Sequence, residues 1–169
     1  MLQRRLVSFA LRGLHVVSDL KKLAVMRGWD REGIPDGQRD LWLFWLVNHV
    51  CLAYMTSHNP RNYHEALAEA APFIPQGWSR AKFCNKVSAI YQKVQEMASG
   101  RRWLSFGGKV WPLYYTPSNA RLVEDLRLTE LELEQMDYLR FGGSEAAQRK
   151  RKRKEEGKVS QEERSLLAQ

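Results

Sequence analysis

The chain has 169 residues, of which 44% are hydrophobic and six are tryptophan, so we expect a folded body with a hydrophobic core and exclude a largely disordered chain. Its formal net charge is +8, which falls to +2 without the six consecutive cations at residues 149–154. The charge therefore predicts a nearly balanced body with a strongly basic tail, and the tail is the clearest functional feature.

The N-terminal 17 residues contain three arginines and no acid. This composition fits an amphipathic transit peptide as well as the start of the body. Ser18 and Asp19 predict the beginning of a short helix that ends at Gly28. A loop is expected over residues 29–37, in which Asp36 caps the next helix.

Residues 38–55 are predicted to form the central helix, because apolar side chains cover nearly all its sides and such a helix must be surrounded by others. Its apolar run is shorter than the roughly 20 residues of a bilayer span and contains Asn48 and His49, so we predict no membrane partner. The two cysteines, Cys51 and Cys84, fall inside predicted helices. We expect buried thiols and a cytoplasmic location.

Two further helices are predicted downstream. One begins at Asn59 and Pro60 and ends at Pro72. The other is capped by Ser79 and runs to Gly100, with apolar residues at spacings of three and four. Its opposite side is basic, which we interpret either as a surface that meets phosphates or a DNA groove, or as an ordinary solvated face. The basic residues are Arg80, Lys82, Lys86 and Lys93.

A small β-hairpin is predicted over residues 103–115, because Gly107 and Gly108 supply the positive φ angles of a tight turn. Cations and aromatic side chains alternate around it, and such a surface can stack unpaired bases. The alternative is that its aromatic side chains only anchor the hairpin on the helices. The residues concerned are Arg101, Arg102, Trp103, Phe106, Lys109 and Trp111.

Two short helices complete the predicted body, which ends at residue 143. The first begins at Thr116 and Pro117 and ends at Leu126. The second has a capping box formed by Thr129 and Glu132 and runs to about residue 139.

Residues 144–169 have too few apolar side chains for a core, so they predict a helical or disordered basic tail. Its cation run is expected to contact nucleic-acid phosphates, with a solubilising or targeting tail as the alternative. A second capping-box pattern begins at Ser160 and is followed by Leu166 and Leu167. This pattern indicates a helix that docks on a partner or continues into a further element.

The chain offers no residues with the types and spacing of a catalytic centre, so we predict a non-enzymatic protein without metal or cofactor. The candidate acid pairs for a metal site, Asp30 with Glu32 and Glu124 with Asp125, lie in a predicted loop and on a predicted helix respectively, and we interpret them as solvated surface acids. None of the four histidines has the spacing to a cysteine, an aspartate or a second histidine that marks a zinc site. The glycine pair lacks the Lys-Ser or Lys-Thr of a phosphate-binding loop.

Several motifs resemble a known module. Gly37, Arg39 and Asp40 precede a helix that continues with Leu43 and Phe44, and the helix over residues 63–73 and the Tyr91-Gln92-Lys93 segment follow. Over roughly residues 36–95 this pattern resembles the small helical domain C-terminal to the catalytic part of primases and of plasmid or phage replication initiators. A helix followed by a basic run, as at residues 129–154, is also similar to replication-associated proteins of mobile elements.

The resemblance implies a DNA-replication context and a binding or positioning role alongside separate catalytic machinery. Primer synthesis is not implied, because no catalytic primase part is recognised in the sequence. Function inferred through a fold is analogy.

We therefore expect a mainly α protein: a helical bundle around a central apolar helix, with a small β-hairpin and a basic C-terminal extension. The expected function is DNA binding in replication or maintenance of a plasmid, phage or other mobile element, with replication proteins as further partners. RNA binding and a non-enzymatic protein-interaction role are the alternatives. The predicted nucleic-acid-binding residues are Arg80, Lys82, Lys86, Lys93, Arg101, Arg102, Lys109, Arg149, Lys150, Arg151, Lys152, Arg153 and Lys154.

Overall fold

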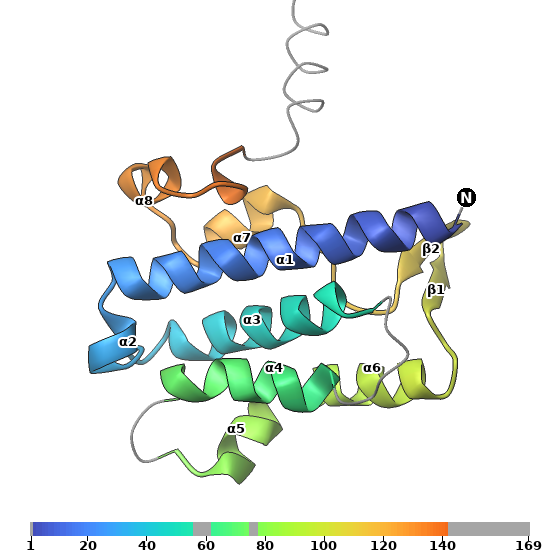
Figure 1. Ribbon diagram of the computed structural model, residues 1–169, viewed down its shortest axis with the longest axis horizontal. Coiled ribbons are helices and arrows are strands. Elements are labelled where there is room, and N and C mark those ends of the chain that lie inside the picture. The colour runs from blue at the N-terminus through green and yellow to red at the C-terminus, as the bar shows by residue number, and fades with distance from the viewer. Residues whose placement is uncertain (1, 56–61, 75–77, 142–169) are drawn as a thin grey trace, which may run out of the picture.

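The computed structural model describes residues 2–55, 62–74 and 78–141, and it confirms a mainly helical fold with one small hairpin (Figure 1). Asn59 and Pro60, together with the basic run at residues 149–154 and the rest of the tail, lie outside the described residues. The elements in chain order are α1 (Leu2–Met26), α2 (Trp29–Glu32), α3 (Arg39–Ala53), α4 (Asn62–Ala70), η1 (Ala71–Phe73), α5 (Arg80–Lys86), α6 (Ser88–Ala98), β1 (Trp103–Phe106), β2 (Lys109–Pro112), α7 (Asn119–Asp125), α8 (Glu130–Glu134) and η2 (Leu139–Phe141).

Helix α3 is the centre of the fold, as its all-round apolar surface predicted. It packs against α1, α4 and α6, and its side chains are buried from Trp45 to Ala53. Figure 1 shows α3 between α1 and α4, which both contact it, and shows α7 and α8 on the other side of α1 in that view. The expected cap is wrong: Gln38 occupies the N-cap position, and Asp36 forms an ion pair with Arg39 at 2.6 Å.

Helix α1 begins far earlier than the predicted start at Ser18. A single helix over Leu2–Met26 buries Leu6, Ala10 and Leu20 on one side, so this stretch forms part of the body. Asp19 is buried inside the helix, and its carboxylate accepts backbone N–H bonds from residues 137, 138 and 139 at 3.0, 2.9 and 2.7 Å. Asp19 therefore ties the first helix to η2, a role that its local sequence does not reveal.

Gly13 sets how closely α1 approaches α3. A Cβ atom at this position would lie 2.6 Å from the backbone nitrogen of Ala53 and 2.8 Å from the carbonyl oxygen of His49. Backbone atoms of a packed helix cannot move aside cheaply, so the two helices need a glycine at their crossing.

The helix predicted from Ser79 to Gly100 is two helices. The cap is confirmed, because the Ser79 hydroxyl accepts a bond from the backbone nitrogen of Lys82. At Val87 the backbone leaves helical geometry, with φ of −108° and ψ of 16°, and α6 begins at the next residue. The apolar spacing continues through this break because Phe83, Val87 and Ile90 all reach the core.

The predicted hairpin is confirmed. Strands β1 and β2 pair antiparallel from Trp103 opposite Pro112 to Phe106 opposite Lys109. Gly107 and Gly108 form the turn with φ angles of 57° and 71°, the left-handed region that a tight two-residue turn requires.

The last helices are shorter than predicted. Ser118 caps α7, rather than Thr116 beginning it, and the capping box of Thr129 and Glu132 is confirmed at α8. Helix α8 ends at Glu134, and residues 139–141 form the separate turn η2. The guanidinium of Arg27 binds both carboxylate oxygens of Glu132, at 2.5 and 2.8 Å, which lowers the pKa of Glu132 to about 2 and fastens the end of α1 to α8.

Cys51 is buried as expected, and burial raises the pKa of its thiol to about 12. Cys84 is only partly buried. In the described residues, no helix combines the length and apolar character needed to cross a membrane.

Candidate nucleic-acid interface

The basic residues of α5 and α6 do not form one shared face. The break at Val87 separates Lys82 and Lys86 from Lys93, and all three contact groups of the protein itself. Lys86 forms an ion pair with Asp40 of α3 at 2.6 Å, and the Lys82 ammonium lies 5.0 Å from the centre of the Trp78 ring. Asp40 thus joins the start of α3 to α5.

Lys93 contacts the segment at the base of the hairpin. Its ammonium donates a hydrogen bond of 2.7 Å to the carbonyl oxygen of Leu113 and lies 4.3 Å from the centre of the Tyr115 ring. Partial burial lowers the pKa of Lys93. These contacts position the chain just after β2 and leave Lys93 less available to a phosphate.

The remaining predicted cations of the body lie near the hairpin or at the start of α5. Arg101 is exposed but forms an ion pair with Glu96 at 2.7 Å, and Arg102 is half-buried. Lys109 begins β2 at the exposed end of the ribbon. Arg80 is exposed and borders a hollow beside α4.

The ribbon has two unlike faces. Side chains alternate along a strand, and residues directly opposite one another on paired strands share a face. One face therefore carries Trp103 and Pro112, which are half-buried and buried at the base of the ribbon. The other carries Leu104 opposite Trp111 and Phe106 opposite Lys109. We call this second set of four side chains the ribbon face.

The ribbon face exposes two large aromatic side chains to solvent. Phe106 is 82% exposed and Trp111 44% exposed, so neither anchors the hairpin on the helices. The sequence left open that all three hairpin aromatics anchor the hairpin on the helices. Of the three, Trp103 has this role, because it packs against the core. Residues 103–112 contain one cation and no acid. The face thus combines flat apolar rings with an uncompensated positive charge.

Asn48 fixes the base of the ribbon. Its side-chain amide donates a bond of 2.9 Å to the carbonyl oxygen of Tyr115 and accepts one of 3.1 Å from the nitrogen of the same residue. The Tyr115 ring lies 5.5 Å from that of Phe44. Sequence reasoning missed this role, although an asparagine inside an otherwise apolar helix was the available signal, since a buried amide needs partners.

The described residues give little support to metal or acid–base chemistry. They contain no group of three histidine, cysteine or acidic side chains that could hold a metal ion. His49 is buried with its Nδ1 atom 2.8 Å from the carbonyl oxygen of Trp45, and burial lowers its pKa to about 4. A neutral histidine enclosed in the core has no access to a substrate.

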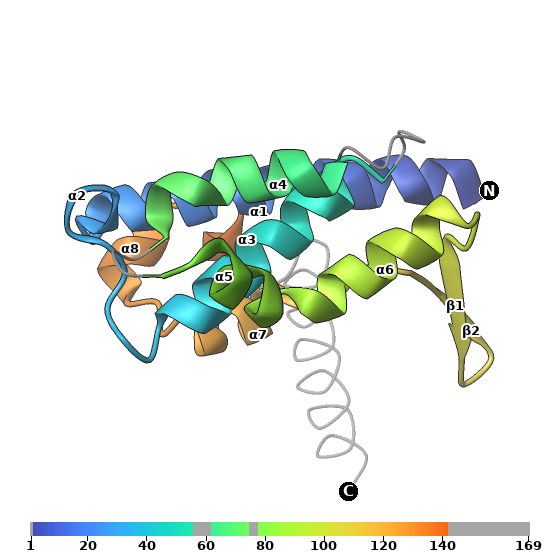
Figure 2. The ribbon, with the colours of Figure 1, turned by 90° about the horizontal axis from the view of Figure 1, so that it is seen from below.

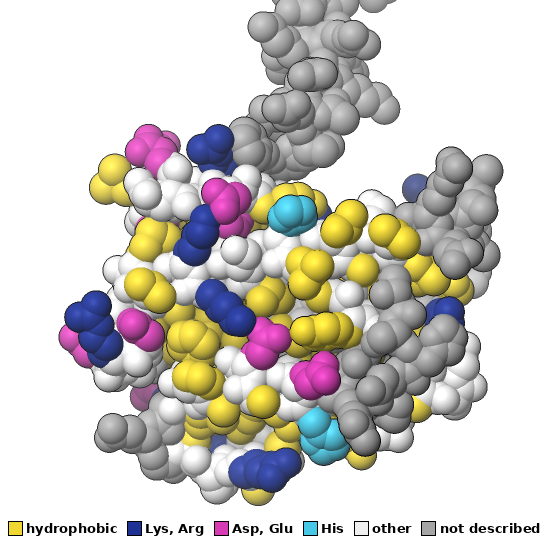
Figure 3. All heavy atoms as spheres, in the orientation of Figure 1, with side chains coloured by type: hydrophobic (Ala, Val, Ile, Leu, Met, Phe, Trp, Pro, Cys, Tyr) yellow, Lys and Arg dark blue, Asp and Glu magenta, His cyan; other side chains and the backbone are white. Residues whose placement is uncertain are grey.

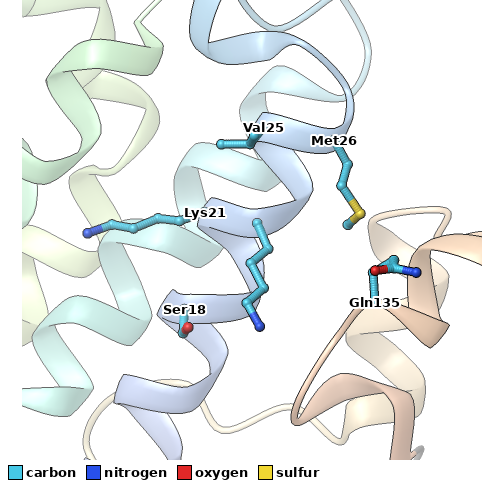
Figure 4. A pocket seen from close by; sticks show the side chains of 6 residues that line it. Ser18, Lys21, Val25, Met26 and Gln135 are labelled. Carbon is cyan, nitrogen blue, oxygen red and sulfur yellow. The ribbon is translucent and has the colours of Figure 1, made fainter.

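A second hollow, of about 570 Å³, lies between the end of α1 and the segment after α8 (Figure 4). Met26 and Gln135 point toward each other across it, whereas Lys21 points away. Lys21 pairs with Glu69 at 2.7 Å and Lys22 with Asp137 at 2.5 Å, so each lysine that lines the hollow contacts an acid.

Comparisons of the chain with protein-family models, with curated proteins and with solved structures gave no match. The resemblance to the primase C-terminal domain stays a prediction from the sequence.

Proposed function

We propose that the chain binds single-stranded nucleic acid, DNA in the first place, with the ribbon face stacking on unpaired bases. The basic run at residues 149–154 adds electrostatic affinity for the phosphates. In this proposal the protein is an accessory or initiator-type component in the replication or maintenance of a plasmid, phage or other mobile element. It performs no catalytic step itself.

The observation that carries the proposal is that Phe106, Trp111 and Lys109 lie together on one exposed face of the ribbon. An aromatic ring left in water costs free energy that a partner can recover by covering it. A base offers a flat ring for stacking and a phosphate for the ammonium, and stacking contributes about 1–3 kcal/mol per base.

Unpaired strands suit this face better than a duplex does. Bases in a duplex are already stacked on their neighbours, so they offer no ring surface to Phe106 or Trp111. Groove reading by a basic helix has less support, because Lys86 and Lys93 are held by internal contacts.

The replication context rests on the resemblance carried by Gly37, Arg39 and Asp40 at the start of α3. Arg39 is half-buried and pairs with Asp36, so these residues contribute structure rather than contacts to DNA.

The test is fluorescence anisotropy of labelled single-stranded and duplex DNA and of single-stranded RNA with the full chain. Phe106→Ala and Trp111→Ala are each expected to weaken single-strand binding about tenfold, the effect of losing one stacked base. Leu131→Ala is the matched control, because Leu131 is 76% exposed and lies on α8, away from the ribbon. Equal affinities for all four proteins would contradict the role of the ribbon face.

The tail is tested in the same full chain by replacing the six cations at residues 149–154 with glutamine. Each phosphate contact that is lost should reduce the slope of log affinity against log salt by about 0.7 for a single strand. An unchanged slope would contradict the contribution of the tail. Tighter binding to RNA than to DNA would transfer the proposal to RNA.

A protein-interaction role is the second candidate, and one observation favours it. Helix α1 leaves Val7, Leu11 and Leu14 about half exposed, and their spacing of four and three residues places them on one side. Figure 3 shows hydrophobic side chains gathered along the face that α1, α3 and α4 present. Failure of every nucleic-acid probe would make this face the next one to examine.

A further inference from the structure

We propose that the hollow between α4 and α5 binds a small organic acid, with the apolar body of the ligand in the hollow and its carboxylate beside Arg80. This site is separate from the ribbon face, and the proposal does not depend on nucleic-acid binding. It gives a role to a predicted basic residue that the proposed function leaves unused.

The hollow is lined by residues of α4, η1 and α5 and by the neighbouring Ile74 and Trp78. Pro72 lies in η1 just after α4, and Ser79 caps α5. Ala68 of α4 and Ala71 of η1 have small side chains, which leave space beside His64 and Leu67. Figure 2 shows α5 crossing the fold in front of α3, close to α4.

The lining of the hollow is mainly apolar. Leu67 and Ile74 are half-buried, and Phe83, which is 1% exposed, lines the hollow from α5. Its volume is about 490 Å³, within the range of roughly 300–1,000 Å³ that small-molecule sites occupy. An aliphatic chain or an aromatic ring therefore has both the space and the apolar contacts that it needs.

The polar groups at the hollow favour an anion. Arg80 borders it with an exposed side chain, and His64 borders it from α4. Trp78 also lines it, and the ring of Trp78 lies 4.3 Å from the Arg39 guanidinium and 5.0 Å from the Lys82 ammonium. None of the described residues that line the hollow is acidic. A guanidinium binds a carboxylate through two parallel N–H bonds, which a neutral ligand of the same shape cannot accept.

An acid with an apolar body fits this arrangement better than a phosphorylated sugar does. A sugar would bring hydroxyl groups against Leu67, Ile74 and Phe83, where the described side chains offer them no hydrogen-bond partners. Arg80 lies at one edge of the hollow, so a ligand that fits must carry its negative charge at one end.

The test is isothermal titration of the full chain with octanoate and with octanamide, which has nearly the same shape but no charge. We expect octanoate to bind with a dissociation constant below about 1 mM and octanamide to bind at least tenfold more weakly. The Trp78 indole N–H resonance should shift on addition of octanoate, and Trp78→Phe identifies that resonance. No binding of octanoate, or equal binding of the two ligands, would overturn the proposal.

Two variants locate the site. Arg80→Gln should weaken octanoate binding about tenfold and leave octanamide unchanged, whereas Arg31→Gln, at an exposed arginine on α2, should change neither. Ala71→Phe should fill the hollow and abolish binding, with Ala120→Phe on α7 as the control for an added ring at an exposed alanine. Unchanged binding in Ala71→Phe would place the ligand elsewhere and overturn the proposal. Phe106→Ala should leave octanoate binding intact even where it weakens nucleic-acid binding.

Discussion

Helix α3 and the β-ribbon have similar aromatic content but opposite surroundings. Trp42 is fully buried in α3, donates a hydrogen bond to the carbonyl oxygen of Leu20 and meets the Phe73 ring edge-on at 4.8 Å. Trp111 of the ribbon is 44% exposed. A tryptophan side chain therefore stabilises the fold in α3, whereas in the ribbon it offers a contact surface. Burial, rather than residue type, separates a core aromatic from a candidate binding aromatic.

The largest expected effect comes from exchanging the two tryptophans for alanine. Trp42→Ala should lower the free energy of unfolding by about 3–5 kcal/mol, since it opens a cavity in the core. Trp111→Ala should lower it by less than about 1 kcal/mol, the contribution of a cross-strand pair. Urea denaturation followed by circular dichroism measures both, and equal losses would contradict the distinction between core and ribbon.

Low pH should reduce the free energy of unfolding through the protonation of His49. Its pKa is lowered from 6.5 to about 4 in the folded protein, so unfolding takes up a proton between these values. The resulting stability is fully present above pH 6.5 and is lost as the pH falls toward 4, by about 3 kcal/mol in all. The free energy of unfolding of the wild type, measured from pH 7 to 4, should therefore fall more steeply than that of His49→Gln. Parallel curves would contradict this account of the buried imidazole.

Gly13→Ala should test the closeness of α1 and α3. Alanine favours a helix over glycine by about 1 kcal/mol, but its Cβ would meet the backbone of Ala53 at 2.6 Å. We expect a net loss of about 2 kcal/mol from overpacking. Ser8→Ala, an exposed position on the same helix, is the control and should be neutral or slightly stabilising. A stabilised Gly13→Ala protein would show that the helices can separate without cost.

The smallest effect on stability is expected for Phe106, at the tip of the ribbon. Phe106→Ala should change the midpoint of thermal unfolding by about a degree or less, because the ring is 82% exposed and loses few contacts. A clear drop in the midpoint would mean that the ring packs on the body. In that case its effect on nucleic-acid binding could not be separated from folding.

Local patterns predicted the elements whose cause is local. The all-round apolar surface of α3, the capping box at Thr129 and the glycine pair of the turn each act within a few residues. The hairpin and its basic surroundings could therefore be expected from the sequence. The partial burial of Trp103 and the exposure of Phe106 could not be expected from it, because they depend on Asn48 and Lys93, which hold the base of the ribbon from other helices.

Two errors have a physical origin in long-range contacts. Ser18 and Asp19 are typical of a helix start, but Asp19 is instead used by backbone groups more than 115 residues away. The basic side of the predicted helix after Ser79 was expected to be continuous. Its residues are divided because the chain bends at Val87 and because Asp40 of another helix takes Lys86.

The contact of Asp19 with η2 also bears on how the protein is made. Its carboxylate is synthesised early, but its three donors follow 118–120 residues later. At ordinary rates of translation this interval is on the order of ten seconds. During that time the Asp19 side chain, which is buried in the finished fold, lacks its three backbone donors, and a polar group without such partners favours solvent. The contact that joins the first helix to η2 can therefore form only when nearly the whole described body has been synthesised.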